Sequence, residues 1–170
     1  AYIKKLTSDV RVVSIVHTSP VTGMTVDLEK ITKEVRNATP DCIIIVDGIQ
    51  HSSHGAIDVQ KYDIDGYVVS PYKMFSRHGY GVAWASDRLC TLNKEQLADG
   101  PFENWELGTR DAGSYATFSD VVDYLDWLGS NFTESENTRE RLEASSIAIK
   151  SHEQELVLSL IHISEPTRLR

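Results

Sequence analysis

The chain has 170 residues and a formal net charge of −8 at pH 7, with 41% hydrophobic and 25% charged residues. This composition is that of an ordinary globular protein, which argues against disorder and coiled coil, and no apolar run approaches the roughly 20 residues of a membrane span. So acidic a chain is a poor non-specific ligand for phosphate backbones, and we expect neither nucleic acid nor a membrane as partner. The cysteines, Cys42 and Cys90, fit neither a disulfide framework nor a zinc site, so we expect a reducing, cytoplasmic location.

The first part of the chain predicts a strand, a helix and a second strand. Residues 11–17 (RVVSIVH) form a short β-branched run that is typical of a buried strand. Asp27 can cap a helix over Leu28–Asn37, whose apolar residues recur at helical spacing. The run Cys42–Val46 is apolar throughout, which indicates a strand covered on both faces in a parallel sheet.

The remaining elements extend this unit and then turn helical. Gly66–Ser70 and Tyr80–Ala85 predict further strands, and a short helix is expected to begin at Asp87. Apolar spacing predicts longer helices over Tyr115–Leu128 and Thr138–Val157. The series predicts an α/β fold with a mostly parallel sheet and flanking helices, in which ligands bind at the carboxyl ends of the strands.

The two ends of the chain call for separate predictions. The sequence begins at Ala1 without an initiator methionine or the apolar region of a signal peptide, so we expect native residues to precede it. Residues Leu158–Arg168 (LSLIHISEPTR) resemble the translation of a sequencing adapter, and we expect Leu158–Arg170 to be a non-native tail. The alternative is a native apolar helix end or strand over Leu158–Ile163.

Polar residues follow three of the predicted strands. His17 ends the first strand, Asp47 follows the second, and Ser70 and Lys73 follow the third. Because carboxyl ends of parallel strands meet at one edge, the carboxylate and the amine together predict a cofactor site. An aspartate can keep a pyridinium nitrogen protonated, and a lysine of lowered pKa can form a Schiff base.

An ordered series of motifs resembles a known family. Residues 46–84 (VDGIQHSSHGAIDVQKYDIDGYVVSPYKMFSRHGYGVAW) resemble the central segment of class V aminotransferases, and most of all the cysteine desulfurase/selenocysteine lyase group. Later matches are WELGT at Trp105–Thr109, VVDYLDWLG at Val121–Gly129 and a His-Glu-x-x-Leu helix at His152–Leu156. The resemblance implies the large domain of a pyridoxal-phosphate (PLP) enzyme of fold type I.

The resemblance also implies a role for each matching residue. Lys73 would form the Schiff base with the cofactor and move the proton at the Cα of an amino-acid substrate. Asp47 would pair with the pyridine nitrogen, and Gln50 would hydrogen-bond the phenolic oxygen. Ser70 would bind the phosphate, and so would Tyr72, which stands where many desulfurases have a histidine.

The same resemblance makes predictions about assembly and completeness. Thr109 would reach the phosphate of the partner subunit, which implies a homodimer. We expect residues 1–157 to be a partial PLP-binding large domain, because the family's earlier segment and its small domain fall outside it. We therefore expect the chain of 170 residues to be inactive by itself.

Three alternatives to a desulfurase-like lyase stay open. Pro20 stands in a Thr-Ser-Pro stretch where the family often has an asparagine, and this form is closer to an epimerase-like branch; an aminotransferase of the same family is equally compatible. In another class, His51 and His54 could join Asp47 in the metal site of a hydrolase. We favour loop histidines there and predict no metal site.

Overall fold

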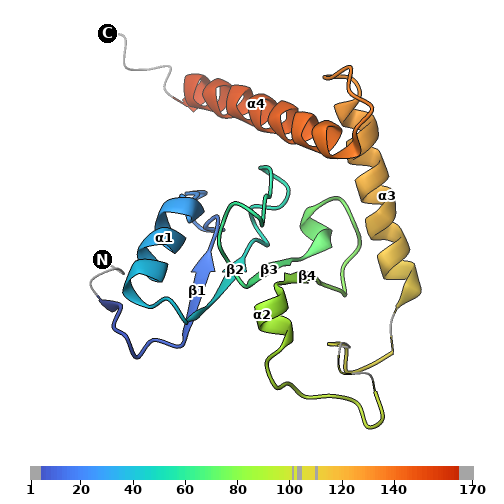
Figure 1. Ribbon diagram of the computed structural model, residues 1–170. Helices are drawn as coiled ribbons and strands as arrows, with labels where there is room; N and C mark the ends of the chain where they lie inside the picture. The colour runs from blue at the N-terminus through green and yellow to red at the C-terminus, as the bar shows by residue number, and fades with distance from the viewer. Residues whose placement is uncertain (1–4, 101, 103–104, 110, 165–170) are drawn as a thin grey trace. The chain divides into compact units, whose positions relative to one another are not determined.

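The computed structural model describes residues 5–100, 102, 105–109 and 111–164 (Figure 1). The chain divides into two compact units. The first unit combines Ala1–Ser52 with Ile57–Phe118, and the second combines Ser53–Ala56 with Ser119–Arg170. The sheet and every residue of the predicted cofactor site belong to the first unit.

A four-stranded sheet forms the centre of the first unit (Figure 1). Its strands lie in chain order and are β1 (Val12–Val16), β2 (Ile43–Asp47), β3 (Gly66–Val69) and β4 (Val82–Ala85). The first three are parallel, whereas β4 is antiparallel to β3. The predicted α/β fold with a mostly parallel sheet is therefore confirmed. The chain leaves the sheet at the carboxyl end of β3 and enters β4 from that same end, so β4 runs antiparallel to β3.

Helix α1 (Leu28–Ala38) connects β1 to β2, as the sequence predicts. The Asp27 side chain accepts a hydrogen bond from the Lys30 backbone N–H at 3.0 Å and so caps the first turn. At the other end the Thr39 N–H donates to the Val35 carbonyl at 2.8 Å. The helix buries Leu28 and Val35 against the sheet.

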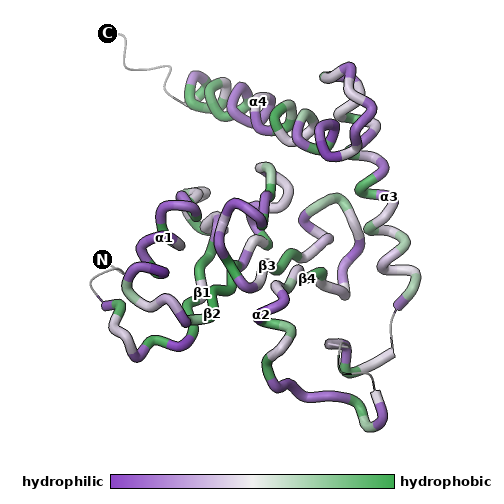
Figure 2. Tube along the Cα trace, in the orientation of Figure 1, coloured by the Kyte–Doolittle hydropathy of each residue, from purple (hydrophilic) through white to green (hydrophobic). Residues whose placement is uncertain are grey.

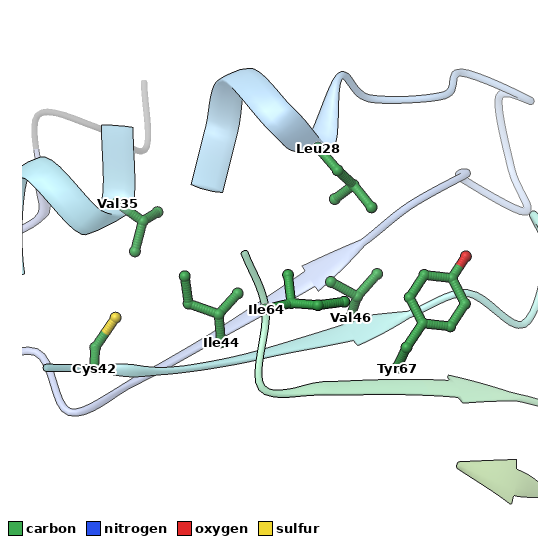
Figure 3. Close-up of a cluster of buried hydrophobic side chains, with 7 residues drawn as sticks. All are labelled: Leu28, Val35, Cys42, Ile44, Val46, Ile64 and Tyr67. Carbon is green, nitrogen blue, oxygen red and sulfur yellow. The ribbon is translucent and has the colours of Figure 1, made fainter. Parts of the chain in front are cut away.

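The core of the first unit lies between α1 and the sheet. Figure 3 shows Leu28 and Val35 of α1 facing β2, and the full cluster is Leu28, Val35, Cys42, Ile44, Val46, Ile64 and Tyr67. The strands are largely hydrophobic, whereas α1 is hydrophilic over much of its length (Figure 2). We predicted that both faces of β2 are covered. The structure confirms this for one face and shows that it is wrong for the other. Ile44 and Val46 are buried, but Ile43 and Ile45 alternate to the other face and stay half-buried.

A buried carboxylate joins the elements at the starting end of the sheet. The Asp65 Oδ2 atom accepts hydrogen bonds from Arg36 Nη2 at 2.9 Å and from the Ile44 N–H at 2.8 Å. Its Oδ1 atom lies 3.4 Å from Ser86 Oγ and 3.6 Å from Arg88 Nε. Burial alone lowers the pKa of Arg36, but the hydrogen bond and charge of Asp65 outweigh it and raise that pKa above its ordinary value.

The two arginines of this cluster also bind the turn that precedes β2. Arg36 Nη1 donates to the Cys42 carbonyl, and Arg88 Nη2 donates to the Asp41 carbonyl, each at 2.6 Å. Arg88 lies in the short helix α2 (Asp87–Cys90), whose first turn is capped by the Ser86 hydroxyl. One carboxylate therefore fixes the end of α1, the start of β2 and the start of β3.

The longer helices are α3 (Ala112–Gly129) and α4 (Thr138–Ser164). In the second unit, Arg141 of α4 donates to Asp126 of α3 at 3.2 Å. Helix α4 continues past Val157, so residues 158–163 take a helical form, as the alternative interpretation allowed. The origin of Leu158–Arg170 stays a prediction, and residues 165–170 lie outside the described residues. Among the described helices, none has the length and apolar character that a membrane span requires.

We expect Asp65→Asn to lower the free energy of unfolding by about 3 kcal/mol, because it removes the charge that compensates two arginines in a buried site. Asp63 is the matched control. It also pairs with Arg36, at 3.4 Å, but its side chain is 71% exposed. Asp63→Asn should therefore cost less than about 0.5 kcal/mol. Denaturant unfolding followed by circular dichroism measures both changes, and equal losses would contradict the anchoring role of Asp65.

Candidate functional site

The predicted site residues gather at the carboxyl edge of the parallel strands. Asp47 is the last residue of β2, and its partner across the ladder is Val68 near the end of β3. Ser70 follows β3 and begins the short 3-10 helix η2 (Pro71–Lys73), which ends at Lys73. The sheet therefore brings a carboxylate and an amine that are distant in sequence to the same edge, as predicted.

A short hydrogen bond joins the two loops of this edge. Lys73 Nζ donates to the Gln50 side-chain oxygen Oε1 at 2.6 Å, and both side chains are partly buried. Lys73 is oriented by η2, in which its backbone N–H donates to the Ser70 carbonyl at 3.0 Å. The partner of the amine is the oxygen of a neutral amide. The contact therefore fixes the orientation of the amine without pairing it with a carboxylate.

The Asp47 carboxylate is held by its own turn. Its Oδ1 atom accepts a hydrogen bond from the Ile49 N–H at 3.0 Å, and its carbonyl accepts one from the His17 N–H at 2.9 Å. Burial, together with the neighbouring Tyr62 and the Asp47 carboxylate, raises the pKa of the Tyr67 phenol. That phenol therefore keeps its proton and can donate a hydrogen bond.

Glycine at position 48 makes room for an aromatic ring. A Cβ built at Gly48 would overlap the outer atoms of the Tyr67 ring. The Gly48 N–H donates to the Val68 carbonyl at 2.9 Å, which extends the ladder beyond Asp47. A larger residue here would displace either the ring or the turn that carries Asp47 and Gln50.

The Tyr72 ring lies near the Lys73 amine and stacks on His78. The rings of Tyr72 and His78 stack with their centroids 4.3 Å apart, and Lys73 Nζ lies 5.8 Å from the centre of the Tyr72 ring. Tyr72 is exposed and Ser70 is half-buried. Their hydroxyls can donate hydrogen bonds to an anionic ligand.

Thr109 lines a cavity that, over the described residues, includes none of the other predicted site residues. It is exposed and lines a cavity of about 260 Å³ together with Gly79, Gly81, Glu106 and Tyr115. Within the described part of the chain, no hydrogen bond or ion pair joins Thr109 to Lys73 or Asp47. The structure therefore does not bring this predicted residue to the others.

Two buried histidines, His17 and His51, also lie at the carboxyl edge, and from the sequence we predicted a contact with the cofactor for neither of them. The rings of His17 and His51 stack with centroids 3.6 Å apart and an interplanar angle of 24°. His17 Nδ1 lies 2.8 Å from the Tyr67 hydroxyl. Burial, and then the charge of His51, lower the pKa of His17 to about 4. The sequence did contain a signal that both histidines lie near the site, because His17 ends a predicted strand and His51 directly follows Gln50.

The metal alternative finds no support in the geometry. His51 contacts Thr18 and His17, whereas His54 belongs to the second unit and pairs with Glu153, with His54 Nδ1 2.7 Å from Glu153 Oε1. Over the described residues, no three His, Cys, Asp or Glu side chains lie close enough to hold a metal ion.

The parallel sheet and the lysine at its carboxyl edge define an α/β domain with a ligand site at its strand ends. The chain belongs to the aminotransferase class-V family, whose model matches residues 1–155. Members of this family are enzymes that use pyridoxal 5'-phosphate. The predicted family is therefore confirmed.

Individual relatives cover different shares of the chain. It is 32% identical over 89 residues to a probable cysteine desulfurase of Mycoplasma genitalium, a match that covers 52% of this chain and 22% of that protein. It is 30% identical over 167 residues to the aminotransferase-like protein FGM3 of Gibberella zeae, covering 95% of this chain and 38% of the relative. The chain thus spans well under half the length of these relatives.

A solved structure supports the same fold. The apo cysteine desulfurase of Thermococcus onnurineus NA1 superimposes with a TM-score of 0.67 at 21% identity, over 92% of this chain and 38% of that one. Similarity at this level of identity concerns the fold alone. The predicted fold type I architecture is confirmed.

The low pKa of His17 makes the folded state less stable in acid. Between pH 6.5 and about 4 the unfolded chain binds a proton at His17 that the folded chain does not, so the free energy of unfolding falls as the pH falls. The loss reaches about 3 kcal/mol at the acid end and is absent above pH 6.5. Denaturant unfolding at a series of pH values should show that His17→Phe removes this slope and exposed His152→Gln retains it. Identical slopes in all three proteins would contradict the assignment.

Gly48→Ala should lower the free energy of unfolding by about 2 kcal/mol, because the added methyl group overlaps the Tyr67 ring. Gly108→Ala is the control, since a Cβ at Gly108 meets nothing within 4 Å. Thermal or denaturant unfolding measures both variants. A Gly48→Ala protein as stable as the Gly108→Ala protein would show that the ring can move aside without cost.

Proposed function

We propose that this chain holds the cofactor of a PLP-dependent enzyme that acts on an amino acid, most similar to a cysteine desulfurase or selenocysteine lyase. The observation that carries the proposal is the 2.6 Å contact between Lys73 Nζ and Gln50 Oε1 at the carboxyl edge of the sheet. The names of the Mycoplasma genitalium and Thermococcus onnurineus proteins support the choice of reaction.

The side chains at this edge fit the chemistry of PLP. Lys73 supplies the amine that would hold the cofactor covalently, and Gln50 supplies an amide beside it. Asp47 provides a carboxylate for the ring nitrogen, and the hydroxyls of Ser70 and Tyr72 would bind the phosphate. When bound, PLP supplies an electron sink that stabilises negative charge at the Cα of an amino acid.

Each residue then has a task that follows from its own chemistry. The Lys73 amine takes a proton from the substrate Cα or returns one, since it is a base on a loop that reaches the ligand. Gln50 orients that amine through its amide oxygen. Asp47 keeps a proton on the ring nitrogen by placing a fixed negative charge beside it.

The proposal includes a homodimer in the cytoplasm. Thr109 is exposed and lines a cavity that does not include Lys73, which leaves it accessible to the phosphate of a partner subunit. Cys42 and Cys90 are both free thiols, in keeping with a reducing compartment. Light scattering of the purified full-length protein tests the dimer.

A second candidate reaction, epimerisation, is favoured by the loop after β1. Pro20 has no N–H and no side-chain donor, and the Ser19 hydroxyl is occupied by the N–H groups of Val21 and Thr22, at 3.3 and 3.2 Å. This loop therefore offers no side-chain amide to a cofactor or substrate at position 20. Products distinguish the candidates: a desulfurase converts cysteine to alanine and passes on one sulfur atom at the zero oxidation level, which added dithiothreitol reduces to sulfide for assay. An epimerase changes the configuration at Cα, and an aminotransferase forms a keto acid.

We expect borohydride treatment of the full-length protein, after addition of PLP, to leave a pyridoxyl group on Lys73. Visible absorbance before and after reduction, followed by peptide mass spectrometry, measures this. Lys73→Ala should abolish the label, whereas Lys61→Ala, at an exposed lysine that pairs with Asp58, should leave it unchanged. The absence of a label in the wild-type protein would overturn the proposal. The chain of 170 residues by itself is expected to show no steady turnover.

A further inference from the structure

Two stacked histidines lie directly behind the turn that carries Asp47 and Gln50. His17 follows β1 and is 4% exposed, and His51 follows Gln50 and is 9% exposed. Neither has a role in the proposed chemistry. Two buried imidazoles in face-to-face contact are nonetheless costly unless their polar atoms are satisfied.

Each ring is fixed by a partner on a different segment. His17 Nδ1 lies 2.8 Å from the Tyr67 hydroxyl of β3, and His51 Nδ1 lies 3.0 Å from Thr18 Oγ1. Thr18 is itself held by the Thr25 hydroxyl at 2.9 Å. These contacts tie both rings to the sheet, so neither ring can rotate without losing a buried hydrogen bond.

The turn is held at two points, one through the backbone of His17 and one through the stacked rings. At its start, the backbone N–H of His17 donates to the Asp47 carbonyl at 2.9 Å, a bond that does not require the histidine ring. At its end, the His51 ring stacks on the His17 ring. The Ser52 N–H closes the turn on the Gly48 carbonyl at 2.9 Å. Gln50 lies between the two points, so its backbone position is set from both sides.

We propose that the stacked His17–His51 pair is the positioning element of this site, which holds the Asp47–Gln50 turn so that the Gln50 amide meets the Lys73 amine. This positioning role applies to the protein without a ligand. The effect that it has on PLP binding rests on the proposed function. His17 and His51 are positioning residues and touch neither reacting group themselves.

The first measurement is hydrogen exchange of the ligand-free protein. His51→Ala removes both the stacking and the contact with Thr18, so the Ser52 amide should exchange about tenfold faster, the equivalent of one lost hydrogen bond. The Ile44 amide in β2 should be unaffected. His51→Phe retains a ring against His17 and should show a smaller change. The control His152→Gln, at an exposed histidine of α4, should match the wild-type protein.

The second measurement is the dissociation constant of PLP, read from absorbance of the bound cofactor. His51→Ala should weaken binding about tenfold, because Gln50 no longer orients Lys73. Val35→Ala separates positioning from general loss of stability. Figure 3 shows Val35 at the Cys42 end of the core, away from Tyr67. This variant should destabilise the protein and leave the dissociation constant of PLP unchanged.

The outcomes separate the two proposals. Unchanged Ser52 exchange in His51→Ala would overturn the positioning role, and so would PLP binding as tight as in the wild-type protein. Equal weakening of PLP binding by Val35→Ala would also overturn the positioning role, because any loss of stability would then be enough to weaken PLP binding. If the wild-type protein binds no PLP, the proposed function fails, and the exchange measurement still decides whether the histidines hold the turn.

Discussion

The buried carboxylate of Asp65 holds the starting ends of the sheet together. It accepts hydrogen bonds from Arg36 and from the backbone of Ile44, and Arg36 in turn binds the Cys42 carbonyl. A charge buried this deeply is stable when its partners are complete, so the end of α1, the start of β2 and the start of β3 have one favourable arrangement. The register of β2 on β3 follows from this anchor, and with it the position of Asp47 relative to Lys73.

The opposite edge of the sheet carries the proposed ligand site and no comparable anchor among the described residues. Its polar side chains, Asp47, Gln50 and Lys73, are half-buried at the end of β2, in the turn after it and in η2. Asp65, in contrast, is buried among fixed partners. Parallel strands produce this division because all their carboxyl ends fall on one side. The Lys73 amine meets a neutral amide and not a carboxylate, so it is directed without being locked into a permanent ion pair.

Packing transmits order from the core to this edge. Tyr67 belongs to the core cluster, its ring occupies the space beside Gly48, and its hydroxyl reaches His17. His17 stacks on His51, which is adjacent to Gln50 in the chain. A continuous series of contacts therefore runs from the buried centre of the domain, past Gly48 and the two histidines, to the turn whose Gln50 side chain contacts Lys73.

Hydrophobic periodicity and helix caps are local signals, and from them the elements and the shared edge of the proposed site could be predicted. Leu28–Asn37 and Asp27 predicted α1 and its cap, and the order of Asp47, Ser70 and Lys73 after apolar runs predicted the shared edge. Four features could not be predicted in this way: the Lys73–Gln50 contact, the His17–His51 stack, the Asp65 anchor and the antiparallel direction of β4. Each of these depends on side chains or strands that meet across long stretches of sequence, and no local pattern encodes such a meeting.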